Sequence, residues 1–65
     1  MALNLLADDE LLSEAETAEA LDVHLRTLKR WRILAEDPPH IQIGRKIYYR
    51  RGAIRQWLLG LEGGQ

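Results

Sequence analysis

Two consecutive prolines, Pro38 and Pro39, divide the chain into a part with helical spacing and a part with strand spacing. Proline interrupts a helix, and it also biases the residue before it towards an extended backbone. From His40 onwards apolar and polar residues alternate, which is the period of a half-buried strand. The division predicts helices before the prolines and a β-hairpin after them.

A short helix is expected near the start of the chain. Ser13 and Glu16 have the spacing of a capping box, and the residues that follow favour a helix over about residues 14–21. Asp22 then provides a turn. Residues 1–10 contain two leucine-rich patches without a sustained helical period, so they are expected to form a flexible N-terminal arm.

A second helix is expected to begin near His24 and to carry apolar and basic residues on opposite faces. Leu28 and Trp31 form its inner face, whereas Arg26 and Arg30 each lie about 160° from Leu28 on a helix with 100° per residue. An outward-facing basic helix suits the major groove of DNA, where arginine bonds guanine and lysine or threonine holds phosphates. The candidate DNA-binding residues of this helix are His24, Arg26, Thr27, Lys29 and Arg30.

A β-hairpin with a cationic tip is expected after the prolines. Ile41 and Ile43 alternate with polar residues, and Gly44 marks a turn before the next apolar run at residues 47–49. Such an arm can enter the minor groove or clamp phosphates. The candidate DNA-binding residues of this wing and its flank are Arg45, Lys46, Tyr48, Arg50 and Arg51.

The charges are unevenly distributed along the chain. Residues 1–22 carry seven acids and no base, whereas residues 23–60 carry all nine bases against two acids, a net charge of +7. Taken singly, the basic helix and the hairpin tip are also explained as solvated charge on an exposed surface. The two clusters together favour a nucleic-acid partner, because the acidic first third shows that solubility does not require bases.

A final helix is expected over about residues 52–60, ended by Gly60. Its apolar face is formed by Ile54, Trp57 and Leu58. The expected elements are, in order, a helix, a turn, a second helix, a β-hairpin and a third helix, so the fold class is mainly α with a small β-hairpin. This order predicts a winged helix-turn-helix domain over residues 11–60. Residues 61–65 are expected to be a disordered tail.

The length and composition exclude several classes of protein. At 65 residues the chain has room for one domain with a thin core. Cysteine is absent, which excludes disulfides and fits a cytosolic protein. No stretch approaches the ~20 apolar residues that cross a bilayer, and no signal sequence is recognisable, so no membrane partner is expected. The large aromatic residues expected to fill the core are Trp31, Tyr49 and Trp57.

The sequence contains no recognisable catalytic constellation. His24 and His40 have no cysteine, serine nucleophile or carboxylate at the spacing that catalysis or metal binding requires. The carboxylates of the first helix could pair for acid–base chemistry, but a solvated helix face is the simpler interpretation. A glycine-rich phosphate loop is also lacking. We therefore expect no enzyme activity, metal, cofactor or small-molecule substrate.

Six short motifs occur together: Leu11-Leu12-Ser13, Leu21-Asp22-Val23, Thr27-Leu28-Lys29-Arg30-Trp31, Pro38-Pro39-His40-Ile41-Gln42-Ile43-Gly44-Arg45-Lys46, Tyr49-Arg50-Arg51 and Trp57-Leu58. This set, over about residues 11–59, resembles the excisionase-like, MerR-related winged helix-turn-helix domains. Members of that family are small DNA binders of phages, prophages and mobile elements, either excisionases that direct an integrase or short transcription regulators. The resemblance implies that the second helix is the recognition helix and that Gly44-Arg45-Lys46 is the wing tip.

The sequence departs from the family pattern at three places. Asp22 stands where glycine is usual in the turn; aspartate tolerates the left-handed conformation better than most residues, so the turn is expected to persist. His24 stands where serine or threonine usually caps the recognition helix. Ile33 and Leu34 lie in a segment that usually holds charged residues and a glycine. These two residues point away from the helix core and are a candidate protein contact, and local packing under the hairpin explains them equally well.

These observations favour a non-enzymatic, sequence-preferring DNA-binding protein of phage, prophage or mobile-element type. It would act as an excisionase-like recombination directionality factor or a small transcriptional regulator. The expected partners are double-stranded DNA, an integrase, and other copies of the chain on adjacent sites, in the nucleoid of a bacterial cytoplasm. The alternative is a protein-interaction adaptor whose acidic first helix and Ile33-Leu34 patch bind an integrase or a polymerase-associated partner.

Overall fold

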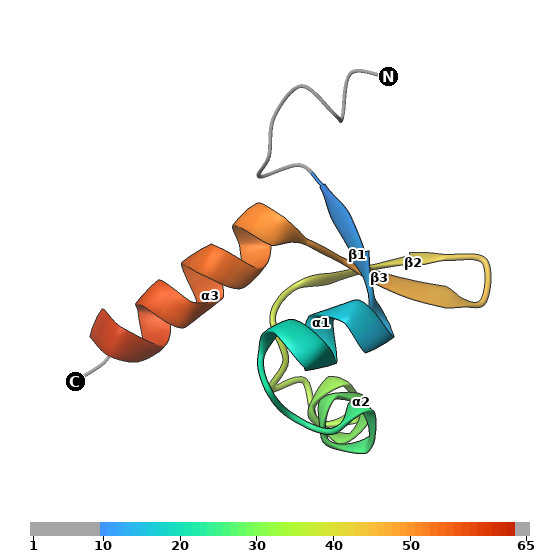
Figure 1. Cartoon of the computed structure of the whole chain (residues 1–65), viewed down its shortest axis with the longest axis horizontal. Coiled ribbons are helices and arrows are strands. Elements are labelled where there is room, and N and C mark those ends of the chain that lie inside the picture. Colours follow the sequence, from blue (N-terminus) through green and yellow to red (C-terminus); the bar gives the residue numbers. More distant parts are fainter. Residues whose placement is uncertain (1–9, 64–65) are drawn as a thin grey trace.

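The structure is a computed structural model that describes residues 10–63; residues 1–9 and 64–65 are not described. Within residues 10–63, three helices and three strands follow one another (Figure 1). In chain order they are β1 (Leu11–Ser13), α1 (Glu14–Ala20), α2 (Leu25–Ile33), β2 (His40–Ile43), β3 (Lys46–Arg50) and α3 (Arg51–Gly63). The predicted winged helix-turn-helix fold is confirmed: α1 and α2 form the helix-turn-helix, and β2 and β3 form the wing.

The sheet contains one strand more than the predicted hairpin. Its order is β1-β3-β2, and all neighbours are antiparallel. The two-residue loop Gly44-Arg45 closes the hairpin beyond the Ile43–Lys46 pair, with Gly44 at a left-handed φ of 64°. On the other side of β3, Leu12 pairs with Tyr49. A three-residue strand is too short to show a period of two, so β1 carries no signal that sequence periodicity could detect.

The first helix begins as the capping box predicts. The Ser13 hydroxyl accepts a hydrogen bond from the Glu16 amide at 3.0 Å, and the Glu16 carboxylate accepts one from the Ser13 amide at 2.8 Å. The Thr17 hydroxyl is buried and donates to the Ser13 carbonyl at 2.8 Å. These bonds fix the point at which β1 ends and α1 starts.

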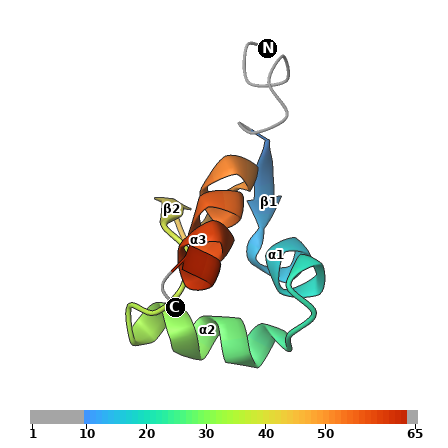
Figure 2. The same ribbon diagram turned by 90° about the vertical axis from the view of Figure 1, so that its left-hand side faces the viewer.

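A small core holds the helices against the sheet. Its fully buried side chains include Leu28 of α2 and Tyr49 of β3, packed with Ala18 and Ile54. Figure 2 shows α2 running beneath α3, and the two helices meet where the Trp31 and Trp57 rings lie 6.0 Å apart. The core positions predicted for Tyr49 and Leu28 are confirmed, whereas both tryptophans are only half-buried.

The last helix differs from its prediction at its end and on its apolar face. It continues to Gly63 instead of ending at Gly60, so the tail predicted over residues 61–65 is wrong for residues 61–63; residues 64–65 lie outside the described part. Gly60 weakens the helix by about 1 kcal/mol relative to alanine, but it retains the backbone N–H and C=O groups that a helix needs. Leu59 and Leu61, on either side of it, are strong helix formers. Leu58 was expected to face the core, but it is 40% exposed because α3 extends beyond the body of the domain.

The predicted flexible arm over residues 1–10 lies almost entirely outside the described residues. Only Glu10 is described, and it is joined to the start of α3. Its carbonyl accepts a hydrogen bond from the Arg51 amide at 2.9 Å, and its carboxylate forms an ion pair with the Arg51 guanidinium at 3.1 Å. These two contacts fix Glu10 beside the start of α3.

Candidate nucleic-acid interface

The turn between α1 and α2 sets the angle at which α2 is presented. Asp22 has a left-handed φ of 59°, and its amide donates to the Glu19 carbonyl at 3.1 Å. The Val23 amide donates to the Ala18 carbonyl at 3.0 Å. This pair of bonds is a Schellman motif, which ends a helix with a left-handed residue. The turn persists with aspartate in the position that favours glycine, as predicted.

His24 begins α2 through its backbone. It has the extended backbone of an N-cap residue, and its carbonyl accepts bonds from the Thr27 and Leu28 amides at 2.9 and 3.1 Å. Its side chain makes no capping hydrogen bond and is exposed. The imidazole is therefore available at the end of α2 that a helix-turn-helix points at a ligand.

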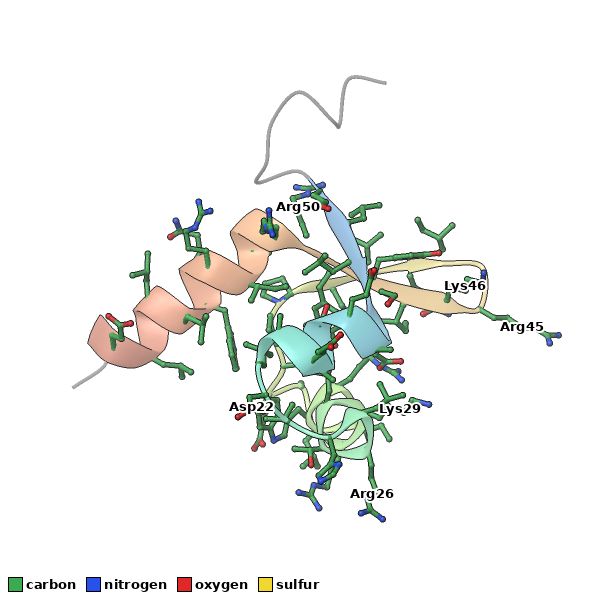
Figure 3. All side chains as sticks on the ribbon, viewed as in Figure 1. Asp22, Arg26, Lys29, Arg45, Lys46 and Arg50 are labelled. Atoms are coloured by element: carbon green, nitrogen blue, oxygen red, sulfur yellow. The ribbon has the colours of Figure 1, made fainter. Side chains whose placement is uncertain are left out.

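The outer face of α2 carries three exposed cations. Arg26, Lys29 and Arg30 are all exposed, whereas Leu28 on the opposite face is fully buried. Thr27 lies at the edge of this face and is half-buried. In Figure 3, Arg26 and Lys29 project from α2 away from the body of the domain. The opposition of apolar and basic faces that the helical spacing predicts is present in the fold.

The cationic residues of the wing separate into two groups. Arg45 and Lys46 are exposed at the hairpin tip, the outermost point of the sheet (Figure 3). Arg50 lies at the other end of β3, about 13 Å from Lys46 at the rise of a strand, and Arg51 begins α3 in an ion pair with Glu10. The structure therefore does not bring Arg50 and Arg51 together with the tip, although they were assigned to one cluster.

Tyr48 lies behind the tip cations, in a groove that Arg45 and Lys46 also line. It is half-buried and lines a shallow groove of about 380 Å³ between the wing and the start of α1. Ser13 and Glu14 form part of the opposite wall of this groove. Tyr48 is thus set back behind Arg45 and Lys46, beside the strand that sequence periodicity missed.

Arg32 faces α1 and not the outer side of α2. Its Nε donates to the Glu14 carboxylate at 2.8 Å, and both side chains are half-buried. The pair joins the last turn of α2 to the first turn of α1. Because this carboxylate is 18 residues away in sequence, only the fold shows that Arg32 is already neutralised.

A buried carboxylate connects the end of the helix-turn-helix to the wing. Asp37 accepts hydrogen bonds on one oxygen from the Tyr49 hydroxyl at 2.7 Å and from the His40 ring at 3.0 Å. Burial raises the pKa of Tyr49 well above its usual value, and the adjacent Asp37 raises it further. His40 and Tyr49 are direct partners in the β2–β3 register, so the three groups set the base of the wing. No sequence motif marked this cluster.

Ile33 and Leu34 remain exposed at the end of α2. Their exposed fractions are 77% and 56%, so the alternative that they pack under the hairpin is wrong. The following turn is again a Schellman motif, in which Ala35 has a φ of 60° and the Glu36 amide donates to the Trp31 carbonyl at 2.8 Å. The turn holds the apolar pair at the surface.

Two kinds of feature are absent from residues 10–63. No three His, Cys, Asp or Glu side chains in this range gather so that they could hold a metal ion. Within the same range, no helix has the length and apolar character needed to traverse a bilayer.

Comparison with known protein families gives a match over most of the described chain. A family model described as a helix-turn-helix domain matches residues 11–61. Comparisons with curated proteins and with solved structures give no significant match. The matched range begins with β1 and includes the helix-turn-helix, the wing and most of α3.

Proposed function

The chain belongs to the helix-turn-helix domain family, and from that premise we propose that it is a sequence-preferring protein that binds double-stranded DNA. In this proposal α2 is the recognition helix and enters the major groove. The hairpin tip contacts the neighbouring backbone or minor groove. The observation that carries the proposal is the set of five exposed cations on α2 and the wing tip.

These five cations have no carboxylate partner among residues 10–63. They are Arg26, Lys29, Arg30, Arg45 and Lys46. Arg32 and Arg51, by contrast, are held by Glu14 and Glu10. Cations without a protein partner are the groups that can displace counterions from phosphates, which supplies most of the non-specific affinity for DNA.

The two groups of cations are assigned different roles. Guanidiniums on the outer face of α2 can form two parallel hydrogen bonds with guanine, so Arg26 and Arg30 are proposed to read bases. His24, Thr27 and Lys29 are proposed to contact phosphates or neighbouring base edges at the rim of the helix. Arg45 and Lys46, on a two-residue loop, are proposed to hold the backbone without reading sequence.

The finer family assignment is also a proposal. The motif pattern resembles excisionase-like and MerR-related domains, which supports a role as a recombination directionality factor or a small transcriptional regulator encoded by a phage, prophage or mobile element. One winged domain covers a short site, so useful specificity requires several copies or an integrase partner. The protein would then act at the bacterial nucleoid.

A second candidate function is favoured by the exposure of Ile33 and Leu34. An apolar pair held at the surface beside a charged helix is a feature of protein contacts. With the acidic α1, it would bind an integrase or a polymerase-associated partner. This adaptor role and DNA binding use different surfaces, so they can be tested separately.

The first test measures the affinity for DNA as salt is varied. Fluorescence anisotropy with selected and random duplexes should show a slope of log K against log salt of up to about −4.5, since each phosphate contact contributes about −0.9. Arg45→Ala should reduce the slope by about 1 on every duplex. Arg51→Ala is the matched control, and it should leave the slope unchanged because Arg51 lies away from the tip in an ion pair.

A second variant tests base reading. Arg30→Ala should lower the preference for the selected duplex over random DNA by about 1–3 kcal/mol, whereas Arg45→Ala should weaken both equally. A slope near zero for the wild-type chain would refute DNA binding. Equal losses on both duplexes for Arg30→Ala would refute the assignment of α2 as the base-reading element.

A further inference from the structure

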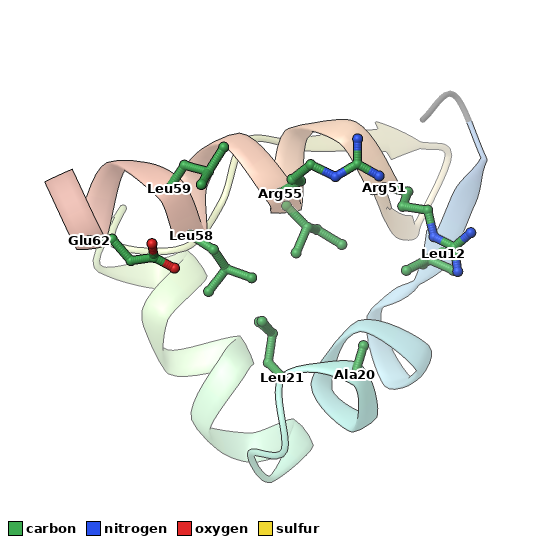
Figure 4. Close-up of a pocket in the computed structure, with 9 residues that line it drawn as sticks. Leu12, Ala20, Leu21, Arg51, Arg55, Leu58, Leu59 and Glu62 are labelled. Atoms are coloured by element: carbon green, nitrogen blue, oxygen red, sulfur yellow. The ribbon is translucent and has the colours of Figure 1, made fainter. Parts of the chain in front are cut away.

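The recognition helix and the wing need a fixed relative position if both are to meet one duplex. Few backbone contacts join α2 directly to β2 or β3, whereas α2 packs closely against α1. Elsewhere in the domain, an apolar groove of about 380 Å³ lies between α1 and α3 (Figure 4), and no residue of α2 or of the wing lines it. The segment that joins α2 to the wing, residues 34–39, is therefore the place to look for what sets their relative position. We call this segment the link.

The link is stiff and is tied to α2 at its first end. Ala35 has a left-handed φ of 60°, and the Glu36 amide donates to the Trp31 carbonyl at 2.8 Å. Two prolines follow, and the side chain of Pro38 is fully buried. Each proline has a fixed φ and also restricts the backbone of the residue before it. The link therefore has few conformations to exchange between.

A single carboxylate oxygen ties the other end of the link to both strands of the wing. Asp37 Oδ2 accepts a hydrogen bond from the Tyr49 hydroxyl of β3 at 2.7 Å and one from the His40 ring of β2 at 3.0 Å. The Asp37 side chain is only 5% exposed, and the fully buried Tyr49 belongs to the same core as Leu28 of α2. Without this carboxylate the Tyr49 hydroxyl would lose the partner it has here, and an unpaired buried polar group is costly.

We propose that Asp37 is a positioning residue for DNA binding, which fixes the wing relative to α2 so that Arg45 and Lys46 reach the duplex that α2 reads. The inference rests on the proposed function and adds the residue that joins its two surfaces. A tip held at a fixed angle has a high effective concentration at its phosphates, whereas a tip that swings loses that advantage. Asp37 acts through the wing, since its own side chain is buried.

The first measurement follows the position of the wing without DNA. The chain has no cysteine, so two nitroxide labels can be attached through Ile33→Cys at the end of α2 and Ile43→Cys beside the wing tip, both at exposed positions. Double electron–electron resonance should give one narrow distance distribution with the wild-type link. Asp37→Ala should broaden the distribution. Asp37→Asn should restore most of its sharpness, because the amide oxygen can accept both hydrogen bonds.

The second measurement follows DNA binding by anisotropy over a series of salt concentrations. Asp37→Ala should reduce the magnitude of the salt slope by up to about 1.8, the share of two phosphate contacts at about 0.9 each. Its preference for the selected duplex should stay at the wild-type value, since α2 keeps its cations. A merely structural role would lower the folded fraction and weaken binding to both duplexes without changing the slope. Glu36→Ala, which removes the neighbouring exposed carboxylate, is the matched control and should keep the slope.

Two milder variants keep the test decisive if Asp37→Ala does not fold. Tyr49→Phe and His40→Ala each remove one of the two donors and leave the carboxylate in place. Each should broaden the distance distribution and lower the salt slope by less than Asp37→Ala does. Far-UV circular dichroism and thermal unfolding give the folded fraction of every variant at the assay temperature.

Two results would overturn the proposal. If the folded variants keep the wild-type distance distribution, Asp37 does not position the wing. If the distribution broadens while the salt slope stays at the wild-type value, DNA binding does not depend on a fixed wing. Failure of the proposed function is distinguishable from both, because the wild-type chain itself would then show a slope near zero while the label distances still report on the wing.

Discussion

The turn after α2 provides a sharp test of how the backbone positions the recognition helix relative to the wing. Ala35 is exposed and has a φ of 60°, a conformation that costs a residue with a Cβ about 1–2 kcal/mol. Glycine adopts it without that cost, but glycine also gains about 0.4–1 kcal/mol of conformational freedom in the unfolded chain. The difference predicts that Ala35→Gly raises the free energy of unfolding by about 0.5–1 kcal/mol.

The gain should appear in thermal unfolding followed by circular dichroism or calorimetry. For a domain of this size, about 1 kcal/mol shifts Tm by roughly 4–8 °C. Asp22→Gly is the matched comparison, since Asp22 has nearly the same φ of 59° but aspartate tolerates it better, so its gain should be smaller. Ala53→Gly, inside α3, should instead lose stability by about 1 kcal/mol. A variant Ala35→Gly that is less stable than wild type would refute the reasoning.

Two further predictions concern the contacts behind the interface. Tyr49→Phe should cost about 1–2 kcal/mol in urea unfolding at neutral pH, because the buried Asp37 loses one donor. The pKa of Tyr49 is higher in the folded chain than in the unfolded chain, so the unfolded state loses its proton first and wild-type stability should fall above pH ~10 by up to ~1.4 kcal/mol per pH unit. Tyr49→Phe should lack that part of the alkaline loss, and an unchanged pH profile would contradict this assignment. Arg32→Met should cost about 1–2 kcal/mol, less than the ~3–5 kcal/mol of a fully buried pair, because Glu14 is only half-buried. It should leave the salt slope of DNA binding unchanged, and a reduced slope would show that Arg32 contacts phosphate after all.

The elements that could be predicted from the sequence are those specified by neighbouring residues. The capping box of Ser13 and Glu16, the left-handed turn at Asp22 and the hairpin at Gly44 each depend on groups within about five residues. Their physical cause is local, so the sequence pattern contains it. The opposition of Leu28 and the arginines on α2 follows in the same way from helical geometry.

The features that the sequence did not reveal depend on partners far along the chain. Strand β1 exists because Leu12 pairs with Tyr49, and three residues carry no period of their own. The exposure of Leu58 depends on where the body of the domain ends beneath α3, which the helical pattern of α3 does not encode. The stripe itself is predicted correctly, but Leu58, Leu59 and Leu61 near its end are 40%, 50% and 56% exposed.

The role of each cation also depends on parts of the fold that are distant in sequence. Arg30 and Arg32 are two residues apart on one helix, yet Arg30 faces outward while the fold places Glu14 against Arg32. Arg50 and Arg51 are close to the wing tip in sequence, but a strand of five residues carries them to the opposite end of the sheet. Sequence proximity therefore groups bases that the fold separates, because it contains neither the distance that β3 spans nor the Glu10 carboxylate that the fold places beside Arg51. The cations left without such partners on α2 and the tip define the surface on which DNA binding should be tested.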